Sequence, residues 1–316
     1  MRVVEGSEAL GAPLPGSVVT VGNFDGLHVG HRAIMDTVTS RAAALAAPAV
    51  VYTFEPHPRK VLYPDRAPQL LTTLDQKLEL LEARGVDIAI VEPFTREFAR
   101  LPAEDFVRRI LYERIRPSEV YVGYDFHYGR DREGSMRTLT ELGPHLGFAV
   151  TIIPEVMVGD RDVNSTRIRQ LLEEGRVTEA ALLLDRPYTV RGAVAKGDQR
   201  GQTIGFPTLN LAAENEILPA RGVYAGHVRF LDEGDPARDS LWPAVTNVGK
   251  RPTFKEDDPV LAEAHLLGFE GPAYGRRIEI AFEHFLREEK RFPDVEALTA
   301  QIGRDAVRAR EVLAEG

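Results

Sequence analysis

Cysteine is absent from this chain of 316 residues. Without it, no disulfide framework, thiolate metal site or cysteine nucleophile can form. The first 17 residues also lack the long apolar core of a secretory signal, and their glycines and prolines predict an exposed approach to a first strand. Together these absences predict a cytoplasmic location.

Basic residues are outnumbered, with 39 Lys and Arg against 48 Asp and Glu. The net charge of −9 disfavours nucleic acid and anionic membranes as partners, because phosphate backbones are bound chiefly by clustered Lys and Arg. Long apolar runs are missing too. The longest nearly uncharged stretch, residues 42–54, contains Pro48 and falls short of the ~18 to 20 apolar residues that span a bilayer. We therefore expect no nucleic-acid partner and no membrane partner.

The remaining composition, 43% hydrophobic and 28% charged, is that of a globular protein, and the length favours two domains. In the first half, short apolar runs alternate with helix-patterned segments. Because the runs are apolar at nearly every position, they predict strands covered on both faces, as in a parallel sheet flanked by helices. Thr73 and Gln76 form a capping-box pattern that opens a helix toward Gly85. The predicted strands are residues 18–21, 50–54, 86–91, 120–123 and 149–153.

The alternation of apolar runs and helical segments ends at Arg186-Pro187, after helical patterns at 167–172 and 177–184. Extended segments with Gly and Pro between them predict an antiparallel sheet or small barrel, and an amphipathic helix begins near Asp294. The prediction is thus a doubly wound α/β domain over residues 1–185, then a mainly antiparallel β-barrel domain over 186–316 with a C-terminal helix. The extended segments are residues 188–196, 222–230, 242–248, 261–269 and 277–285.

The first apolar strand runs directly into the string G-N-F-D-G-L-H-V-G-H at residues 22–31. Free backbone N–H groups at a helix start favour an anionic phosphate, and the glycines allow it to approach closely. His28 and His31 are three residues apart, so on a first helical turn they share a face and can donate to the same phosphate chain. The alternative is two surface histidines at an ordinary helix start, which the preceding buried strand disfavours.

A second string, N-S-T-R-I-R at residues 164–169, opens the helix that closes the α/β region. Ser165 or Thr166 can cap this helix, while Arg167 and Arg169 supply donors suited to β- and γ-phosphates. Alone, the string is more typical of a capped surface helix with two solvated arginines. Its occurrence together with the first string favours phosphate binding.

Both strings resemble motifs of the adenylyl- and cytidylyltransferase superfamily, H-x-G-H and S-S/T-x-R-x-R, and the longer first string resembles the FAD-synthetase branch. The resemblance implies His28, His31 and Arg167 as catalytic residues. Residues 93–98 and 122–129 resemble that branch's flavin-side segments and imply flavin contacts by Phe94, Asp125 and Tyr128. Tyr128 and His127 stand where the branch often has Phe and Arg, and aromatic residues are more often core than ligand contacts. The implied ATP-binding residues are Gly22, Asn23, Phe24, Asp25, Gly30, Ser165, Thr166 and Arg169.

No G-x-x-x-x-G-K-S/T string occurs, so phosphoryl transfer would need parts other than a Walker loop. The candidate is the stretch 192–211, in which Lys196 precedes glycines whose backbone donors can wrap phosphates. Thr208 and Asn210 would lie on one face of a strand, where their oxygens suit one shared Mg²⁺. The alternative is an ordinary Gly/Pro turn followed by a strand.

That stretch resembles the riboflavin kinase signature G-x-x-x-G-x-x-x-G-F-P-T-A-N, with Leu209 in place of the usual Ala. Segments 221–225, 246–253 and 262–266 resemble further parts of that module, and the resemblance assigns Glu263 as general base. A carboxylate in a mostly apolar strand is costly to bury unless it has a partner or a task; the alternative is a solvated strand face. We expect His265, on the same strand face, to be structural. The implied ATP-binding residues are Lys196, Gly197, Gly201, Thr203, Gly205, Thr208 and Asn210, the last two also holding the metal.

Taken together, the motifs resemble the bifunctional prokaryotic riboflavin kinase/FMN adenylyltransferase (FAD synthetase) family over nearly the whole chain. The resemblance implies that riboflavin and ATP give FMN and ADP, and that FMN and ATP give FAD and pyrophosphate, with Mg²⁺ in both steps. One alternative is a nucleotidyltransferase for another phosphorylated metabolite with a flavin-binding C-terminal barrel; another is a catalytically inactive flavin-binding regulator. A tRNA synthetase is disfavoured because no K-M-S-K-S-like loop follows and the chain is acidic.

Overall fold

The computed structural model describes residues 1–159, 161–195, 205–238, 240–249 and 260–315. The chain divides into two compact units, Met1–Asn164 and Ser165–Gly316. This division falls earlier than the boundary predicted at 185/186, because two helices after Asn164 pack within the second unit. The predicted functional boundary stays a prediction.

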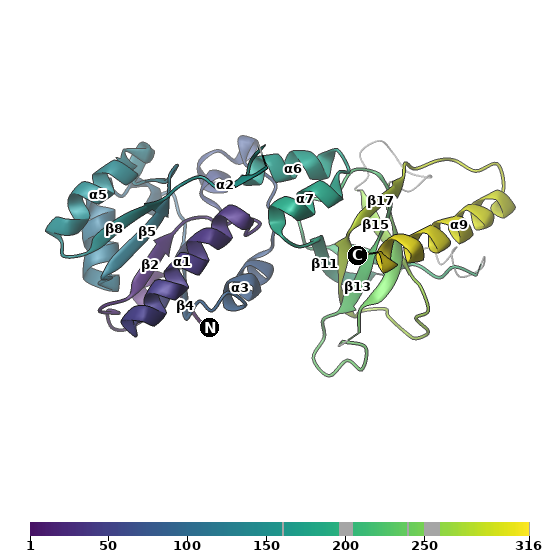
Figure 1. Cartoon of the computed structure of the whole chain (residues 1–316), viewed down its shortest axis with the longest axis horizontal. Helices are drawn as coiled ribbons and strands as arrows, with labels where there is room; N and C mark the ends of the chain where they lie inside the picture. The colour runs from purple at the N-terminus through teal and green to yellow at the C-terminus, as the bar shows by residue number, and fades with distance from the viewer. Residues whose placement is uncertain (160, 196–204, 239, 250–259, 316) are drawn as a thin grey trace. The chain divides into compact units, whose positions relative to one another are not determined.

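The first unit is built on a six-stranded parallel sheet with the strand order β1-β4-β3-β2-β5-β8 (Figure 1). Each of the five apolar runs predicted from the sequence forms one of its strands. The doubly wound parallel sheet is thereby confirmed. The strands are β1 (Arg2–Glu5), β2 (Val18–Val21), β3 (Ala49–Glu55), β4 (Ile88–Pro93), β5 (Glu119–Gly123) and β8 (Ala149–Ile153).

Strand β1 is a correction to the prediction that the first 17 residues merely approach the sheet. It pairs with β4 in parallel at the sheet edge, with Val4 opposite Ile90. Val4 is buried, whereas the other three residues of the strand are exposed or charged edge positions. A four-residue edge strand with one buried side chain has too little apolar pattern to be recognised in the sequence.

Both faces of the sheet are covered, as the uniformly apolar runs predicted. Helices α1 and α3 pack on one face against Val18 and Val51, whereas η4 and α5 pack on the other against Val19 and Val50. Neighbouring strand residues thus enter different cores, which explains why no polar alternation is seen. The helices are α1 (Val29–Leu45), α2 (Pro58–Leu62), α3 (Leu74–Glu82), α4 (Ala103–Asp105), the π-helical η4 (Phe106–Ile115) and α5 (Met136–His145).

Short elements complete the first unit. The predicted capping box is confirmed at Thr73, whose hydroxyl accepts from the Gln76 N–H while the Gln76 side chain accepts from the Thr73 N–H. The helix it opens ends at Glu82, before Gly85. The short elements are η1 (Ser7–Leu10), η2 (Pro64–Arg66), η3 (Phe98–Arg100), η5 (Arg130–Arg132), and the strand pairs β6 (His127–Tyr128) with β7 (Gly134–Ser135) and β9 (Met157–Val158) with β10 (Arg161–Asp162).

The second unit holds the predicted antiparallel barrel. Strands β14-β15-β12-β11-β16-β13 follow one another in the sheet, and a pairing between β13 and β14 closes them into a six-stranded ring. Strand β17 pairs additionally with β13. The strands are β11 (Tyr188–Ala195), β12 (Leu209–Ala213), β13 (Gly222–Phe230), β14 (Trp242–Gly249), β15 (Leu261–Leu266), β16 (Arg277–Phe282) and β17 (His284–Arg287).

Residues 277–285, predicted as one extended segment, form parts of two strands that separate at Glu283. The Glu283 N–H donates to the Ala225 carbonyl, and its carboxylate contacts His227 Nδ1 at 2.7 Å. These contacts turn the chain from β16 into β17, and the apolar pattern on both sides hides the break. Among the described residues, three helices flank the barrel strands in sequence: α6 (Ser165–Glu173), α7 (Val177–Leu184) and the C-terminal α9 (Val295–Ala314), which is capped by Asp294.

Helix α9 packs on the outer surface of the barrel. Its Ala306 and Ala309 share an apolar cluster with Val223 of β13 and Val245 of β14. Within the described part of the chain, no helix has both the length and the apolarity needed to cross a bilayer.

Candidate functional site

The first candidate site lies where the winding of the parallel sheet reverses. The chain passes from β2 outward to β3 and β4, then returns to place β5 on the other side of β2. In open α/β sheets, ligands bind at such a reversal, outside the carboxyl ends of the strands. The string at residues 22–31 leaves the carboxyl end of β2 at this point and enters α1.

His28 and His31 form a stacked pair at the start of α1. Their ring centroids are 3.6 Å apart with an interplanar angle of 18°. His28 is the N-cap, and its Nδ1 accepts from the His31 N–H at 3.4 Å, so a neutral His28 carries its proton on Nε2. His31 Nδ1 is buried and has no hydrogen-bond partner among the described residues. The Nδ1 atom of His31 is therefore available to a ligand.

His31 is held in its neutral form. Burial lowers the pKa of His31 well below its ordinary value, and the nearby His28 and Lys77 lower it further. Neutral imidazoles donate single hydrogen bonds without carrying charge. They suit the oxygens of a phosphate chain but do not neutralise it.

Close packing in the loop fixes the position of the pair. A Cβ on Gly30 would lie 3.2 Å from two atoms of the His28 ring, so glycine lets that ring lie against the helix backbone. Phe24 contacts the His31 ring edge-on, with centroids 5.3 Å apart. Phe24 and Leu27 adopt left-handed φ angles of 49° and 40°, which cost bulky residues energy and cluster at functional loops.

Asn23 and Asp25 occupy the same loop in different ways. The Asn23 Oδ1 atom is buried without a hydrogen-bond partner in the described part of the chain, as expected for a ligand contact. Asp25 Oδ1 accepts from the N–H groups of Leu71 and Thr72 at 2.9 and 3.3 Å. Asp25 thus attaches the loop at residues 22–31 to the segment that precedes α3. Its predicted contact with ATP stays a prediction.

Lys77 of α3 is a residue that the sequence reasoning missed. It is 5% exposed, and its charge is felt by His31. A signal did exist, because Leu74, Lys77, Leu78 and Leu81 share the i, i+3, i+4, i+7 stripe of an amphipathic helix. A lysine on the apolar stripe faces inward rather than toward solvent.

The second predicted phosphate-binding string opens α6. Ser165 begins this helix, Ile168 is fully buried, and Arg167 and Arg169 are partly exposed on either side of it. Thr166 is exposed. These residues belong to the second compact unit, and their phosphate contacts stay predictions.

The predicted flavin residues differ in their surroundings. Phe94 follows β4 and is partly exposed, with its ring edge-on to Phe54 and Phe98 at 5.6 and 5.8 Å. Asp125 is exposed in the turn after β5. Tyr128 is buried in the apolar core, and its hydroxyl lies 3.2 Å from Thr138 Oγ1. Its burial favours a packing role, whereas Phe94 and Asp125 are accessible at the carboxyl edge of the sheet.

The second candidate site is a row of polar side chains on the barrel. Asn210 of β12 is the cross-strand partner of Glu263 in β15, which in turn partners Asn247 of β14. Directly opposed residues point to the same face of a sheet, so the three side chains adjoin one another. The row lies on the outer face, since Val245, two residues from Asn247, packs under α9.

Asn210 is the buried member of this row. It is 9% exposed, and its Oδ1 atom has no hydrogen-bond partner among the residues that the structure describes. Thr208, two residues earlier, directly precedes β12 and is partly exposed. Two oxygen-bearing side chains at this spacing offer the hard ligands that Mg²⁺ prefers.

Glu263 is partly exposed. This exposure agrees both with a general base that substrate can reach and with the alternative of a carboxylate on a solvated strand face. Asn247 was not singled out from the sequence, although its segment was. Its Nδ2 donates to Glu289 Oε1 at 3.4 Å. The Glu289 carboxylate also packs against Gly249, where a Cβ atom would overlap it.

The turn that precedes β12 is attached to β15. His265 Nδ1 lies 2.8 Å from the Pro207 carbonyl, which can only accept, so the proton is on Nδ1. The His265 ring also contacts Phe206 edge-on at 5.3 Å. Gly205 has a φ of 82°, which favours glycine at this point. These contacts agree with a structural His265. Of the predicted phosphate-wrapping residues, Lys196, Gly197, Gly201 and Thr203 lie outside the described residues.

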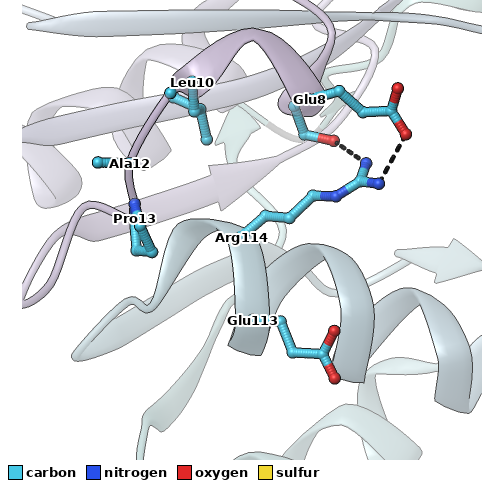
Figure 2. Close-up of a pocket in the computed structure, with 8 residues that line it drawn as sticks. Glu8, Leu10, Ala12, Pro13, Glu113 and Arg114 are labelled. Atoms are coloured by element: carbon cyan, nitrogen blue, oxygen red, sulfur yellow. Dashed lines mark hydrogen bonds and ion pairs between the residues drawn. The ribbon is translucent and has the colours of Figure 1, made fainter.

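A cavity of about 320 Å³ lies elsewhere in the first unit, between η1 and η4 (Figure 2). Arg114 crosses it and pairs with Glu8 at 2.7 Å while donating to Ser7 Oγ. None of the predicted site residues lines it.

Two family models match the chain. The one described as FAD synthetase matches residues 12–167, and the one described as riboflavin kinase matches residues 184–313. Curated relatives named bifunctional riboflavin kinase/FMN adenylyltransferase are similar over nearly their full length. The Escherichia coli K12 relative is 38% identical over 98% of this chain and 97% of its own, and the Pseudomonas fluorescens relative is 36% identical over 99% and 98%.

A crystal structure described as a macrolide-efflux protein from Streptococcus pneumoniae has the same fold. It superposes with a TM-score of 0.86 at 27% identity and covers 98% of this chain and 99% of its own.

Proposed function

This chain belongs to the bifunctional riboflavin kinase/FMN adenylyltransferase family, and we propose which of its residues perform each of the two reactions. The enzyme phosphorylates riboflavin with ATP to FMN and adenylylates FMN with ATP to FAD. The observation that carries this assignment is the occurrence of both family regions, in order, on one chain, with a paired-histidine loop at the sheet reversal in the first.

The adenylyl transfer is assigned to the loop at residues 22–31 together with the start of α6. A phosphate oxygen of FMN attacks the α-phosphorus of ATP, and the bond from that phosphorus to the β-phosphate oxygen breaks to release pyrophosphate. His28 and His31 donate hydrogen bonds to the phosphates as negative charge develops on the leaving group. Arg167 and Arg169 supply the forked donors that suit phosphate oxygens, and Asn23 Oδ1 accepts from a ligand donor.

The phosphoryl transfer is assigned to the polar row on the barrel. Glu263 accepts the proton of the riboflavin 5′-hydroxyl as that oxygen attacks the γ-phosphorus of ATP, and ADP leaves with the electrons of the broken bond. A partly exposed carboxylate next to a buried amide is accessible to such a substrate. Backbone N–H groups of Gly197, Gly201 and Gly205 are proposed to hold the phosphates, with Lys196 and Thr203.

Mg²⁺ fits the residues beside Glu263. Asn210 presents a buried oxygen without a partner in the described chain, and Thr208 adds a hydroxyl two residues away. These two side chains would hold the ion, which supplies charge neutralisation of the ATP phosphates. The same metal requirement is proposed for adenylyl transfer.

The flavin is proposed to contact Phe94 and Asp125 at the carboxyl edge of the parallel sheet. Both positions are accessible there, and Phe94 belongs to a group of edge-on aromatic rings that can extend to an isoalloxazine. Tyr128 would support the flavin site from the core behind it. A cytoplasmic location is proposed from the absence of cysteine.

One assay tests the assignment. Purified protein is incubated with riboflavin, ATP and Mg²⁺, and flavins are separated over time. FMN should appear first and then decline as FAD accumulates, and FMN supplied directly should give FAD and pyrophosphate. A protein that binds flavin and ATP but forms neither product would be a regulator rather than an enzyme.

A further inference from the structure

Lys77 is a buried cation without a direct partner. Its side chain is 95% removed from solvent, since the residue is only 5% exposed. Its ammonium forms no hydrogen bond or ion pair with the described residues. Placing a charged ammonium in these surroundings has a cost, because neighbouring atoms exclude most of the water around the side chain. A ligand that brings negative charge would remove that cost.

Helix α3 holds Lys77 close to the phosphate loop. Asp25 Oδ1 accepts from the N–H groups of Leu71 and Thr72, and the Gly26 N–H donates to Thr72 Oγ1 at 3.3 Å. Thr73 then caps the helix, and the Lys77 N–H donates to the Thr73 carbonyl at 3.0 Å. Lys77 therefore lies one helical turn from the anchors of the loop.

Several charged groups lie near enough to Lys77 to affect its pKa. Burial lowers its pKa, and the carboxylates of Asp25 and Glu55 offset part of that effect. Its own charge in turn lowers the pKa of His31. Lys77 thus lies within electrostatic reach of the histidine pair and of the loop that carries it.

The simplest alternative is that Lys77 only balances Asp25. However, one oxygen of Asp25 already accepts from two backbone N–H groups, and neither carboxylate forms an ion pair with the ammonium. The neutral His31 beside it can donate to phosphate oxygens but brings no charge. The Lys77 ammonium supplies the positive charge that a polyphosphate site in this loop would otherwise lack.

We infer that the Lys77 ammonium binds the β- and γ-phosphates of ATP in the adenylyl-transfer site and stabilises them as they leave as pyrophosphate. The inference rests on the proposed function of the loop at residues 22–31. It makes Lys77 a catalytic residue that lies in α3, outside the two sequence motifs that predicted the site.

The test replaces Lys77 by methionine, which keeps the length of the side chain and removes the charge. FAD formation from FMN and ATP should fall about 10²- to 10³-fold in Lys77→Met, as for loss of one preorganised donor. FMN formation from riboflavin should be unchanged. Lys77→Arg, which restores the charge, should recover part of the loss.

A binding measurement separates a ligand contact from a structural role. Mg·pyrophosphate should raise the thermal unfolding temperature of the wild type, and this shift should be lost in Lys77→Met, while the unfolding temperature without ligand stays equal or rises. The KM for FMN should change little. Arg84→Met is the matched control, because Arg84 is a cation just beyond α3 that pairs with Asp36 at 3.7 Å on the surface.

Several results would overturn the inference. They are a pyrophosphate shift that persists in Lys77→Met, a loss confined to the KM for FMN, or unfolding of both Lys77→Met and Lys77→Gln, which would make the ammonium structural. A wild type that forms no FAD would instead refute the proposed function itself. A wild type that forms FAD alongside an equally active Lys77→Met would refute the inference alone.

Discussion

Histidine occurs at both sites, and the atoms around each ring separate its roles. His265 donates from Nδ1 to the Pro207 carbonyl, and this contact ties a turn to a strand. His31 instead leaves a buried Nδ1 without a partner in the described chain and stacks on His28. A ring nitrogen in use supports the fold, whereas a buried ring nitrogen with no partner indicates a ligand position.

The first prediction concerns the histidine pair. His28→Ala or His31→Ala should lower FAD formation on the order of 10²- to 10³-fold, because each removes a preorganised donor to the leaving phosphates. FMN formation from riboflavin should stay nearly intact. The measurement compares initial rates of both reactions in each variant. Equal damage to both activities would indicate misfolding or a shared site.

A second prediction follows from the low pKa of His31. Its pKa is below the ordinary value of 6.5 in the folded protein, so below that pH the unfolded chain binds more protons than the folded one. The free energy of unfolding is therefore unaffected above 6.5 and falls as the pH drops toward the folded-state pKa, by at most about 1.4 kcal/mol per pH unit. Urea unfolding of wild type and His31→Gln should show a smaller decrease in the variant; parallel decreases would contradict the assignment.

The third prediction concerns Glu263. A positioned base contributes roughly 10²- to 10⁴-fold to such a transfer, so Glu263→Gln should reduce FMN formation by that order. The amide keeps the size of the side chain, so folding and riboflavin affinity should change little, and FAD synthesis from supplied FMN should persist. Asn210→Ala serves as a contrast, since it should raise the Mg²⁺ requirement instead. Near-normal FMN formation by folded Glu263→Gln would remove Glu263 from the mechanism.

At the scale of elements, a strand was predictable from the sequence where its side chains are buried on both faces of the sheet. Strands β2 and β3 place alternate residues in two cores, so nearly every position is apolar and the run is conspicuous. Strand β1 buries only Val4 and escaped notice. The Glu283 break escaped for the opposite reason, because apolar residues continue on both sides of it.

The candidate sites were predictable where a motif is continuous in the sequence. The loop from Gly22 to His31 carries its own glycines and histidines, and the fold places it at the sheet reversal. Asn247 and Lys77 reach the sites only through strand register and helix docking, which no local string encodes. The anchoring contacts of Asp25 likewise depend on a segment 46 residues later.

The fourth prediction belongs to the start of helix α1. Gly30→Ala should favour the helix by about 0.5 to 1 kcal/mol, since alanine has the higher helix propensity. Its Cβ would press on the His28 ring at 3.2 Å and shift it by a few tenths of an ångström. Unfolding should therefore occur at equal or higher urea concentration while FAD formation falls roughly tenfold. An unchanged FAD rate would show that the position of His28 is not critical.

At the scale of the whole molecule, the two divisions of the chain answer different questions. The riboflavin kinase family region begins at residue 184, close to the boundary predicted at 185/186. The compact unit begins at Ser165, because α6 and α7 pack with the barrel: the Ala220 N–H donates to the Leu172 carbonyl at 2.8 Å, and Thr178 Oγ1 donates to the Glu283 carbonyl at 2.9 Å.

The last prediction separates these boundaries with two fragments, residues 165–316 and residues 186–316. Both should make FMN, because the proposed kinase residues follow Arg186, and neither should make FAD. The longer fragment should unfold at a higher urea concentration, because the shorter one loses Leu172 and Leu184, each at most 1% exposed, and burial of a leucine contributes about 1.5 to 3 kcal/mol. Equal urea midpoints would show that the two helices add nothing to the barrel. A longer fragment that folds and binds riboflavin and ATP, yet never phosphorylates, would show that the kinase assignment is wrong.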